Sequence, residues 1–260
     1  MRSIHIIGIG AGDPDYVTAQ AVRALNDARV FFVADKGEAK SDLVALRREV
    51  LRRFVDEPGY RFVELPDPQR AADGDYTSAV ADWHAARAQS WAQAIEAELE
   101  PGAVGAFLAW GDPSLYDSTL RILDQVADRV DLRYDVIPGI TAVQALTARH
   151  RIPLNEVGEP VLITTGRRLR ADGISGTAVV MLDGGCAFLE CPPSTRIWWG
   201  AYLGTPEEIL VAGTVGEVGA RIAELRAAAR ERHGWIMDTY LLRAVPPISH
   251  SHQRSNVGRS

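Results

Sequence analysis

The stretch "GIGAGDPDYVT", Gly8 to Thr18, decides the fold of this chain. It continues the apolar run "SIHIIGI" (3–9), which lacks polar alternation and so indicates a strand buried on both faces of a sheet. Glycines at alternate positions just after such a strand allow the backbone to come close to a neighbour. The stretch therefore predicts either a tight turn or a ligand site where the first strand ends.

The glycine loop fits a dinucleotide fingerprint only in part. A phosphate loop of the Gly-x4-Gly-Lys-Ser/Thr type is excluded, because the required Lys and Ser/Thr are missing. The pattern G-x-G-x-x-G places Asp13 where its third glycine belongs, and a carboxylate there would repel pyrophosphate. Asp35, at the end of the second predicted strand, stands where a ribose-binding acid would. A tight turn whose glycines only relieve strain is the other open interpretation.

The first half of the chain alternates predicted strands and helices. The strand-like runs are 3–9, 29–35, 61–65, 103–110 and 132–137, and the helix-like runs are 18–28, 41–54, 76–100, 114–128 and 139–151. This alternation predicts a mostly parallel sheet covered on both faces. Right-handed crossovers place the loops that follow the strands at one edge, where ligands of such sheets bind.

The pattern changes after "IPLNEVGEP" (152–160), which has the composition of a linker. Strand-like runs then follow with short connections and one clear helix at 217–233. These runs are "PVLITTG" (160–166), "TAVVML" (177–182), "RIWWGAYL" (196–203), "EEILVAG" (207–213) and "WIMDTYLL" (235–242). We therefore predict an α/β protein with a parallel-sheet N-terminal domain, 1–152, and a mixed-sheet C-terminal domain, 158–243. Residues 244–260 are predicted to be a disordered tail or a remnant of cloning.

Composition excludes several classes of function. A net charge of −6 disfavours nucleic-acid binding, which relies on a basic face. No apolar run reaches the ~18–20 residues that span a bilayer, and the start "MRSIHIIG" lacks a signal-peptide cleavage site. Cys186 and Cys191, spaced C-x4-C, and the scattered histidines do not form a metal signature. We expect a soluble, cytoplasmic protein without a metal site.

Two further loops resemble the first. The tripeptide Gly-Asp-Pro occurs at Gly12–Pro14 and again at Gly111–Pro113, each time after a predicted buried strand, and "IPGIT" (137–141) ends the fifth strand. Each loop brings backbone amides to the same sheet edge, and two add a carboxylate. Such a pocket suits a ligand with cationic groups, an amino-acid moiety and a ribose rather than a polyphosphate.

These motifs carry a resemblance that covers most of residues 3–243. The matching stretches are "IGIGAGDPDYVT" (7–18), "AWGDPSLYDSTLRIL" (109–123), "VIPGITAVQALTA" (136–148), "VVMLDG" (179–184) and "GAYLGTPEEIL" (200–210). In this order they resemble the tetrapyrrole methylase family, the S-adenosylmethionine-dependent enzymes of corrin and sirohaem synthesis. "FFVADKG" (31–37) and "GWIMDTYLL" (234–242) are similar to the branch of that family that methylates precorrin-5.

The resemblance implies S-adenosylmethionine bound in the cleft between the two domains and released as S-adenosylhomocysteine. The implied cofactor contacts are Ile9, Gly10, Ala11, Gly111, Asp112, Leu115, Thr141, Ala142, Met181, Leu182 and Leu203. Carboxylates of a tetrapyrrole substrate would be bound by Arg167 and Arg168, because guanidinium groups hold carboxylates in a bidentate fork. The family implies a homodimer, for which "IWWGAYL" (197–203) suits either a contact surface or a core strand.

Methyl transfer from a sulfonium mainly requires alignment, so no side-chain nucleophile is expected. The branch implies methylation of precorrin-5 at C-1 with release of acetate, giving precorrin-6A; another precorrin is the nearest alternative. Release of acetate needs water and a general base, for which Asp35, His150 and Glu156 are unranked candidates. Two rivals come from other classes: a nicotinamide-dependent oxidoreductase and a non-catalytic carrier of tetrapyrrole intermediates.

Overall fold

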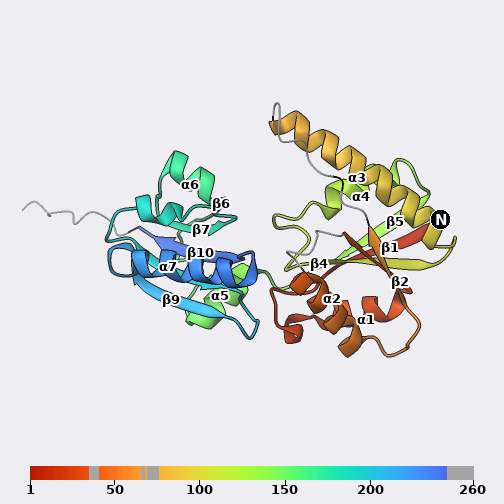
Figure 1. Cartoon of the computed structure of the whole chain (residues 1–260), viewed down its shortest axis with the longest axis horizontal. Helices are drawn as coiled ribbons and strands as arrows, with labels where there is room; N and C mark the ends of the chain where they lie inside the picture. The colour runs from red at the N-terminus through yellow and green to blue at the C-terminus, as the bar shows by residue number, and fades with distance from the viewer. Residues whose placement is uncertain (35–40, 66–67, 69–75, 245–260) are drawn as a thin grey trace, which may run out of the picture.

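The computed structural model describes residues 1–34, 41–65, 68 and 76–244, and these residues form two lobes (Figure 1). Asp35 and residues 245–260 of the predicted tail lie outside the described residues. Each lobe is built around one five-stranded sheet. The predicted α/β fold, with one parallel and one mixed sheet, is confirmed.

The sheet of the first lobe is parallel throughout, in the order β3-β2-β4-β1-β5. Its strands are β1 (Arg2–Gly8), β2 (Val30–Ala34), β3 (Arg61–Leu65), β4 (Val104–Ala109) and β5 (Leu132–Ile137). Strand β1 lies between β4 and β5, and it pairs Gly8 with Ala109 of β4 and Ile7 with Ile137 of β5. The carboxyl ends of these three strands therefore lie side by side, as the sequence predicted.

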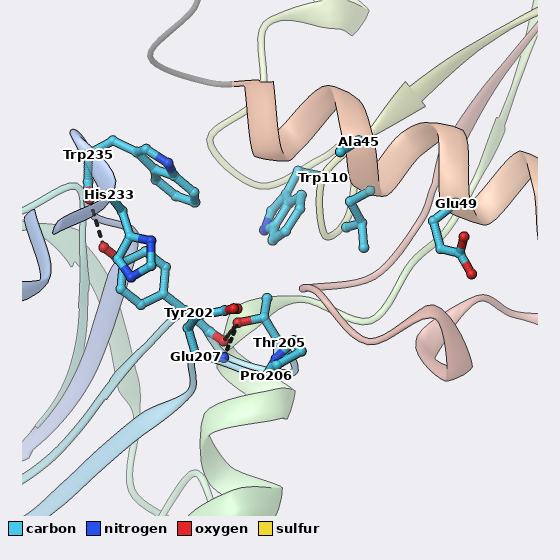
Figure 2. Close-up of a pocket in the computed structure, with 10 residues that line it drawn as sticks. Ala45, Glu49, Trp110, Tyr202, Thr205, Pro206, Glu207, His233 and Trp235 are labelled. Carbon is cyan, nitrogen blue, oxygen red and sulfur yellow. Dashed lines mark hydrogen bonds between the residues drawn. The ribbon is translucent and has the colours of Figure 1, made fainter.

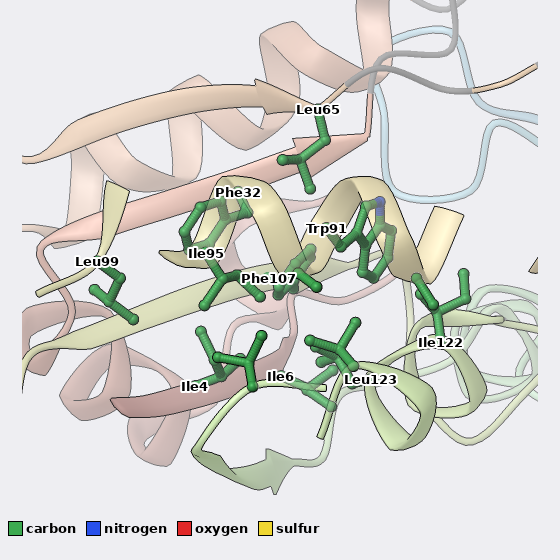
Figure 3. Packing of buried hydrophobic residues seen from close by; sticks show 14 of the residues in the cluster. Ile4, Ile6, Phe32, Leu65, Trp91, Ile95, Leu99, Phe107, Ile122 and Leu123 are labelled. Carbon is green, nitrogen blue, oxygen red and sulfur yellow. The ribbon is translucent and has the colours of Figure 1, made fainter. Parts of the chain in front are cut away.

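Two pairs of helices cover the two faces of this sheet. They are α1 (Ala19–Asp27), α2 (Ser41–Phe54), α3 (Tyr76–Glu98) and α4 (Thr119–Ala127). Ile4 and Ile6 of β1 pack with α3 and α4, whereas Ile7 faces α1 and α2. On the first of these faces, Trp91 stacks on Phe107 with their ring centroids 4.5 Å apart (Figure 3). Both faces are apolar, which explains why the strand sequences do not alternate.

The second sheet is mixed, in the order β6-β7-β10-β8-β9, and β6 and β7 are its parallel pair. Its strands are β6 (Val161–Thr165), β7 (Thr177–Met181), β8 (Arg196–Ala201), β9 (Ile209–Thr214) and β10 (Asp238–Arg243). The helices of this half are α5 (Ala142–His150), α6 (Gly166–Asp172) and α7 (Val215–His233). Ile197, Trp199 and Ala201 of β8 are fully buried, so "IWWGAYL" contributes to the core.

Two features of the second lobe differ from the sequence interpretation. Helix α6 was not predicted, because seven residues that begin with glycine give little periodic signal. Helix α5 was assigned to the first domain, but Val143 and Leu146 pack against Val179 and Leu241 of the second sheet. Side-chain packing therefore groups α5 with the second lobe. The domain limits near 152–158 stay a prediction.

Candidate functional site

The loop that follows β1 (the first loop) and the loop that follows β4 (the second loop) are hydrogen-bonded to each other. After β1 and β4 have ended, Gly10 and Gly111 form an isolated antiparallel bridge. The Gly111 N–H donates to the Gly10 carbonyl oxygen at 2.8 Å, and the Gly10 N–H donates to the Gly111 carbonyl oxygen at 3.3 Å. Both glycines have positive φ, 83° and 66°, which a residue with a side chain rarely adopts. The loops that follow the two parallel strands are thus joined by a separate, antiparallel pair of hydrogen bonds.

The third loop packs against the backbone of the first two. A Cβ atom on Gly139 would lie 2.1 Å from the Gly111 carbonyl oxygen, and one on Gly8 would lie 2.6 Å from the Gly139 nitrogen. Neither position has room for a side chain. The glycines that the sequence places after β1, β4 and β5 therefore let three loops form one block of backbone.

Asp112 holds the second loop to the third. One carboxylate oxygen accepts from the Ser114 backbone N–H at 2.8 Å and from its hydroxyl, and the other accepts from the Gly139 N–H at 2.8 Å. Partial burial acts to raise the pKa of Asp112, but these hydrogen bonds more than offset it and lower the pKa. Asp112 is thus ionised at neutral pH and occupied by protein donors.

The first loop contacts a turn of the second lobe, residues 202–205. A Cβ on Gly12, whose φ is 145°, would lie 2.2 Å from the Leu203 carbonyl oxygen, and one on Gly204 would lie 2.6 Å from the Asp13 nitrogen. Glu208 fixes this turn by accepting from the Gly204 N–H at 2.9 Å. The Glu208 carboxylate is in turn paired with Arg149 of α5 at 2.5 Å.

A cleft of about 600 Å³ opens between the lobes beside these loops (Figure 2). Its lining residues are Ala45, Leu46, Glu49, Trp110, Tyr202, Thr205, Pro206, Glu207, His233 and Trp235. A narrower slot adjoins it and shares Trp110, Tyr202, Thr205 and Trp235 with it. Trp110 comes from the first lobe and Trp235 from the second, so residues of both lobes form the walls.

Three predicted cofactor contacts, Ala11, Ala142 and Leu203, line the slot together. Leu115 and Met181 are half-buried in the apolar cluster that contains Ala11 and Leu203. Ile9 is buried in the core on the α1 and α2 face of the first sheet. Gly10, Gly111 and Asp112 form the hydrogen-bonded loops described above, and Thr141 caps α5 by accepting from the Val143 N–H at 3.1 Å. Leu182 is 67% exposed and lines a neighbouring pocket of about 400 Å³ that also contains Trp235.

The predicted substrate residues lie elsewhere. Arg167 and Arg168 are in the first turn of α6, and neither is among the described residues that line the cleft or the slot. Arg168 pairs with Asp172, one turn along the same helix, at 3.0 Å. The structure thus does not bring these two arginines together with the loops around the cleft.

Two of the candidate bases, His150 and Glu156, are also away from the cleft. The His150 ring nitrogen Nε2 lies 3.0 Å from the Trp199 carbonyl oxygen, and burial lowers the pKa of this histidine. Glu156 pairs with Arg243 at 2.7 Å. Neither His150 nor Glu156 lines the cleft within the described part of the chain.

The sequence interpretation missed the aromatic walls of the cleft. Trp110 directly precedes Gly111, and Tyr202 directly precedes Leu203, so proximity to predicted contacts was the available signal. Trp235 and His233 lie just beyond and at the end of α7, where no motif marked them. The indole nitrogens of Trp110 and Trp235 are buried and have no hydrogen-bond partner among the described residues.

Comparison with known proteins identifies the family. The family profile described as "Tetrapyrrole (Corrin/Porphyrin) Methylases" matches residues 3–219, most of the chain. The chain belongs to this family. The predicted enzyme class, a methyltransferase, is thereby confirmed.

This tetrapyrrole methylase has near relatives over almost its full length. It is 53% identical over 249 residues to the "Precorrin-6A synthase [deacetylating]" of Sinorhizobium sp, a match that covers 94% of this chain and 95% of the relative. A solved structure from Corynebacterium diphtheriae, described as a cobalamin synthesis related protein (CobF), is 45% identical with a TM-score of 0.82 and coverage of 94% and 98%.

A more distant structure shares the fold alone. The tetrapyrrole methylase superposes on the uroporphyrin-III C-methyl transferase of Thermus thermophilus, solved in complex with S-adenosyl homocysteine, with a TM-score of 0.60. That match is 18% identical and covers 93% of this chain and 92% of the other. Within the described residues, no helix is long and apolar enough to span a membrane. No group of three or more His, Cys, Asp or Glu side chains in that part of the chain could hold a metal ion.

Proposed function

We propose that this chain is an S-adenosylmethionine-dependent methyltransferase of cobalamin biosynthesis that methylates precorrin-5 at C-1 and releases acetate, giving precorrin-6A. The observation that carries the proposal is the 53% identity to a deacetylating precorrin-6A synthase over 94% of the chain. The position of the cleft supports it, since ligands of such folds bind beyond the carboxyl ends of parallel strands. Another precorrin is the alternative substrate.

The slot has features that fit S-adenosylmethionine. The slot itself has about 20 Å³ of free space and is lined by the small side chains of Ala11 and Ala142, so most of the ligand would occupy the adjoining cleft of about 600 Å³. A Cβ on Gly111 would meet only the Thr141 Cα, at 3.7 Å, so space remains beside this glycine although its neighbours are tightly packed. The Thermus relative was solved with S-adenosyl homocysteine. We therefore propose the first three loops, Met181, Leu182 and Leu203 as the cofactor contacts, and the bound sulfonium supplies an electrophilic methyl group.

The protein's part in methyl transfer is alignment. The slot shares four residues with the wider cleft, so a methyl donor held where the two meet would be a neighbour of an acceptor in the cleft. The bridge between Gly10 and Gly111 and the Asp112 carboxylate hold the loops in one arrangement before a ligand arrives. Fixed geometry of this kind removes much of the entropic cost of bringing two reactants together.

The wide cleft suits a flat macrocycle. It has about 600 Å³ of space, and the indole rings of Trp110 and Trp235 form apolar walls on opposite lobes (Figure 2). Arg167 and Arg168, which lie in α6 outside the described lining of the cleft, remain our proposed ligands for substrate carboxylates that extend beyond it. Because Arg168 is paired with Asp172, it would exchange that partner for the substrate. A paired Arg167→Ala and Arg168→Ala change should raise the KM for substrate and leave affinity for S-adenosylhomocysteine unchanged.

The assembly and location of the protein are further parts of this proposal. We propose a cytoplasmic homodimer. On the edge strand β6, Leu162 is 53% exposed and Ile163 is 41% exposed, which leaves apolar surface that a second copy could cover. Sedimentation of the purified protein tests the dimer directly.

The deciding experiment incubates the protein with precorrin-5 and S-adenosylmethionine and measures product mass and free acetate together. We expect one S-adenosylhomocysteine and one acetate for each precorrin-6A formed. Methylation without acetate from the wild-type protein would indicate another precorrin as substrate. Calorimetric binding of NADH with none of S-adenosylhomocysteine would favour the oxidoreductase, and tetrapyrrole binding without turnover would favour the carrier.

A further inference from the structure

The charges around the cleft pose a question about substrate binding. The proposed substrate carries carboxylates, yet the described residues that line the cleft include two glutamates, Glu49 and Glu207, and neither a lysine nor an arginine. Two carboxylates repel each other, so the α2 wall needs a cation close to Glu49. We propose that Arg52, which is bonded to Glu49, binds one carboxylate of the substrate in its place. The inference rests on the proposed function, because it names a further residue that selects a polycarboxylate substrate.

Helix α2 brings Arg52 to the end of one wall of the cleft. Ala45, Leu46 and Glu49 of this helix line the cleft, and Figure 2 shows Glu49 at the end of that wall. Arg52 lies three residues further along α2, a spacing that places it beside Glu49 on the helix surface. Its side chain is 72% exposed, so a carboxylate at the edge of a ligand can approach the guanidinium without any change in the core.

Glu49 shows how Arg52 holds a carboxylate. Nε of Arg52 donates to one Glu49 oxygen and Nη2 donates to the other, each at 2.7 Å, in the bidentate arrangement typical of arginine and a carboxylate. These hydrogen bonds lower the pKa of Glu49, so its carboxylate is ionised at neutral pH. Nη1 makes no hydrogen bond to another described residue, so a second carboxylate can approach before the first is released.

The exchange of one carboxylate for another has a small cost. An ion pair between exposed side chains three residues apart on a helix is weak, because water solvates both partners when they separate. The neighbouring Arg53 instead pairs with Asp15 of the first loop at 2.5 Å and so joins two parts of the chain. Arg167 and Arg168 belong to the second lobe, so Arg52 would give the first lobe a carboxylate ligand of its own.

The test measures affinity for precorrin-5 by the quenching of tryptophan fluorescence, with S-adenosylhomocysteine present to prevent turnover. In Arg52→Gln we expect the dissociation constant to rise about fivefold, the upper range for one exposed ion pair. In Glu49→Gln we expect it to fall about threefold, because the substrate then has no competitor for Arg52 and meets no negative charge at this position. Both changes should shrink at about 1 M salt, which screens exposed charges.

Arg48 and Glu64 form a matched control pair. They are 3.3 Å apart, and Arg48 is on the same helix but lies over the Phe62 ring of β3. Neither is among the described residues that line the cleft. Arg48→Gln and Glu64→Gln should keep the affinity for precorrin-5 within about twofold of wild type. Thermal melting and calorimetric affinity for S-adenosylhomocysteine should be unchanged in all four variants.

Opposite effects of Arg52→Gln and Glu49→Gln distinguish a ligand from a structural pair, since loss of a structural pair would have the same effect from either side. Equal affinity of wild type and folded Arg52→Gln would overturn the assignment, as would weaker binding by Glu49→Gln or an equal loss in Arg48→Gln.

Failure of the wild-type protein to methylate precorrin-5 would instead overturn the proposed function. The four variants would then be titrated with uroporphyrin III, a stable polycarboxylate, and judged by the same differences in affinity. A wild-type protein that binds neither tetrapyrrole would overturn the site as well.

Discussion

The same tripeptide, Gly-Asp-Pro, follows β1 and β4, but the aspartates of its two copies accept hydrogen bonds from different parts of the chain. Asp13 accepts from the Asp15 N–H at 2.9 Å and so closes only its own turn. Asp112 makes the equivalent bond to Ser114 and also accepts from the Gly139 N–H of a third loop. The difference arises from position in the sheet, because the loop after β4 lies against the loop that carries Gly139.

The glycines of the two turns also make different contacts. Gly12 touches the second lobe through a close backbone contact with Leu203, while Gly111 has the Gly139 backbone against its carbonyl oxygen. The first turn therefore joins the two lobes, and the second joins two loops of one lobe. A repeated motif indicates a repeated local turn, and the neighbours decide what each copy contributes.

Gly139→Ala should have the largest effect on the second turn. Its Cβ would lie 2.1 Å from the Gly111 carbonyl oxygen, so the loops would have to separate. We expect a loss of about 3 kcal/mol in the free energy of unfolding, measured by chemical denaturation. Gly184→Ala is the control, since a Cβ there meets nothing within 4 Å. Equal stability of the two variants would show that the loops are not packed as described.

Asp112→Ala should have the next largest effect. It leaves the N–H groups of Ser114 and Gly139 without their acceptor, and we expect a loss of about 2 kcal/mol in stability. Release of the third loop should also weaken binding of S-adenosylhomocysteine, measured by calorimetry. Unchanged affinity for S-adenosylhomocysteine in a folded variant would show that the second loop is not part of the cofactor site.

The same carboxylate predicts a dependence on pH. Hydrogen bonds lower the pKa of folded Asp112 below its ordinary value of 3.8, against the opposing effect of burial. Its contribution to stability is therefore present above that value and is lost as the pH falls through the folded pKa. The stability difference between wild type and Asp112→Asn should shrink below about pH 4. A difference that stays constant down to acid pH would contradict the role of the charge.

Glu208→Gln should have a smaller effect, on the junction that the first turn makes with the second lobe. The amide can still accept from the Gly204 N–H but loses the ion pair with Arg149. We expect a few-fold loss of affinity for S-adenosylhomocysteine and little change in melting temperature. If Arg149→Ala shows the same loss and the double variant shows no more, the pair acts as one unit. Additive losses would indicate separate roles.

Asp13→Ala should have the smallest effect. One local hydrogen bond is lost, and the expected cost is about 0.5–1 kcal/mol, typical of a helix cap. Affinity for S-adenosylhomocysteine should be unchanged. If Asp13→Ala and Asp112→Ala weaken cofactor binding equally, the contrast between the two turns fails.

The sequence was sufficient to predict which loops meet at the edge of the first sheet. It was not sufficient to predict which residues contact those loops. Unbroken apolar runs predicted buried parallel strands, and the loops after β1, β4 and β5 meet as expected. The partner of Asp112 could not be predicted, because Gly139 is 27 residues away and meets it only through the strand order. Trp110 and Trp235 reach one cleft from separate lobes, a pairing that no local pattern encodes. The short helix α6 was not predicted, because its seven residues give little periodic signal.

The two tryptophans that face the cleft from opposite lobes also give the protein a built-in optical reporter. The wavelength of indole emission shifts when the surroundings of the ring become less or more polar. Trp110 and Trp235 line the cleft, where a bound ligand would change the surroundings of both rings. Titration with S-adenosylhomocysteine can then be followed by intrinsic fluorescence without a label. Replacing either ring by phenylalanine would tell which lobe senses the ligand.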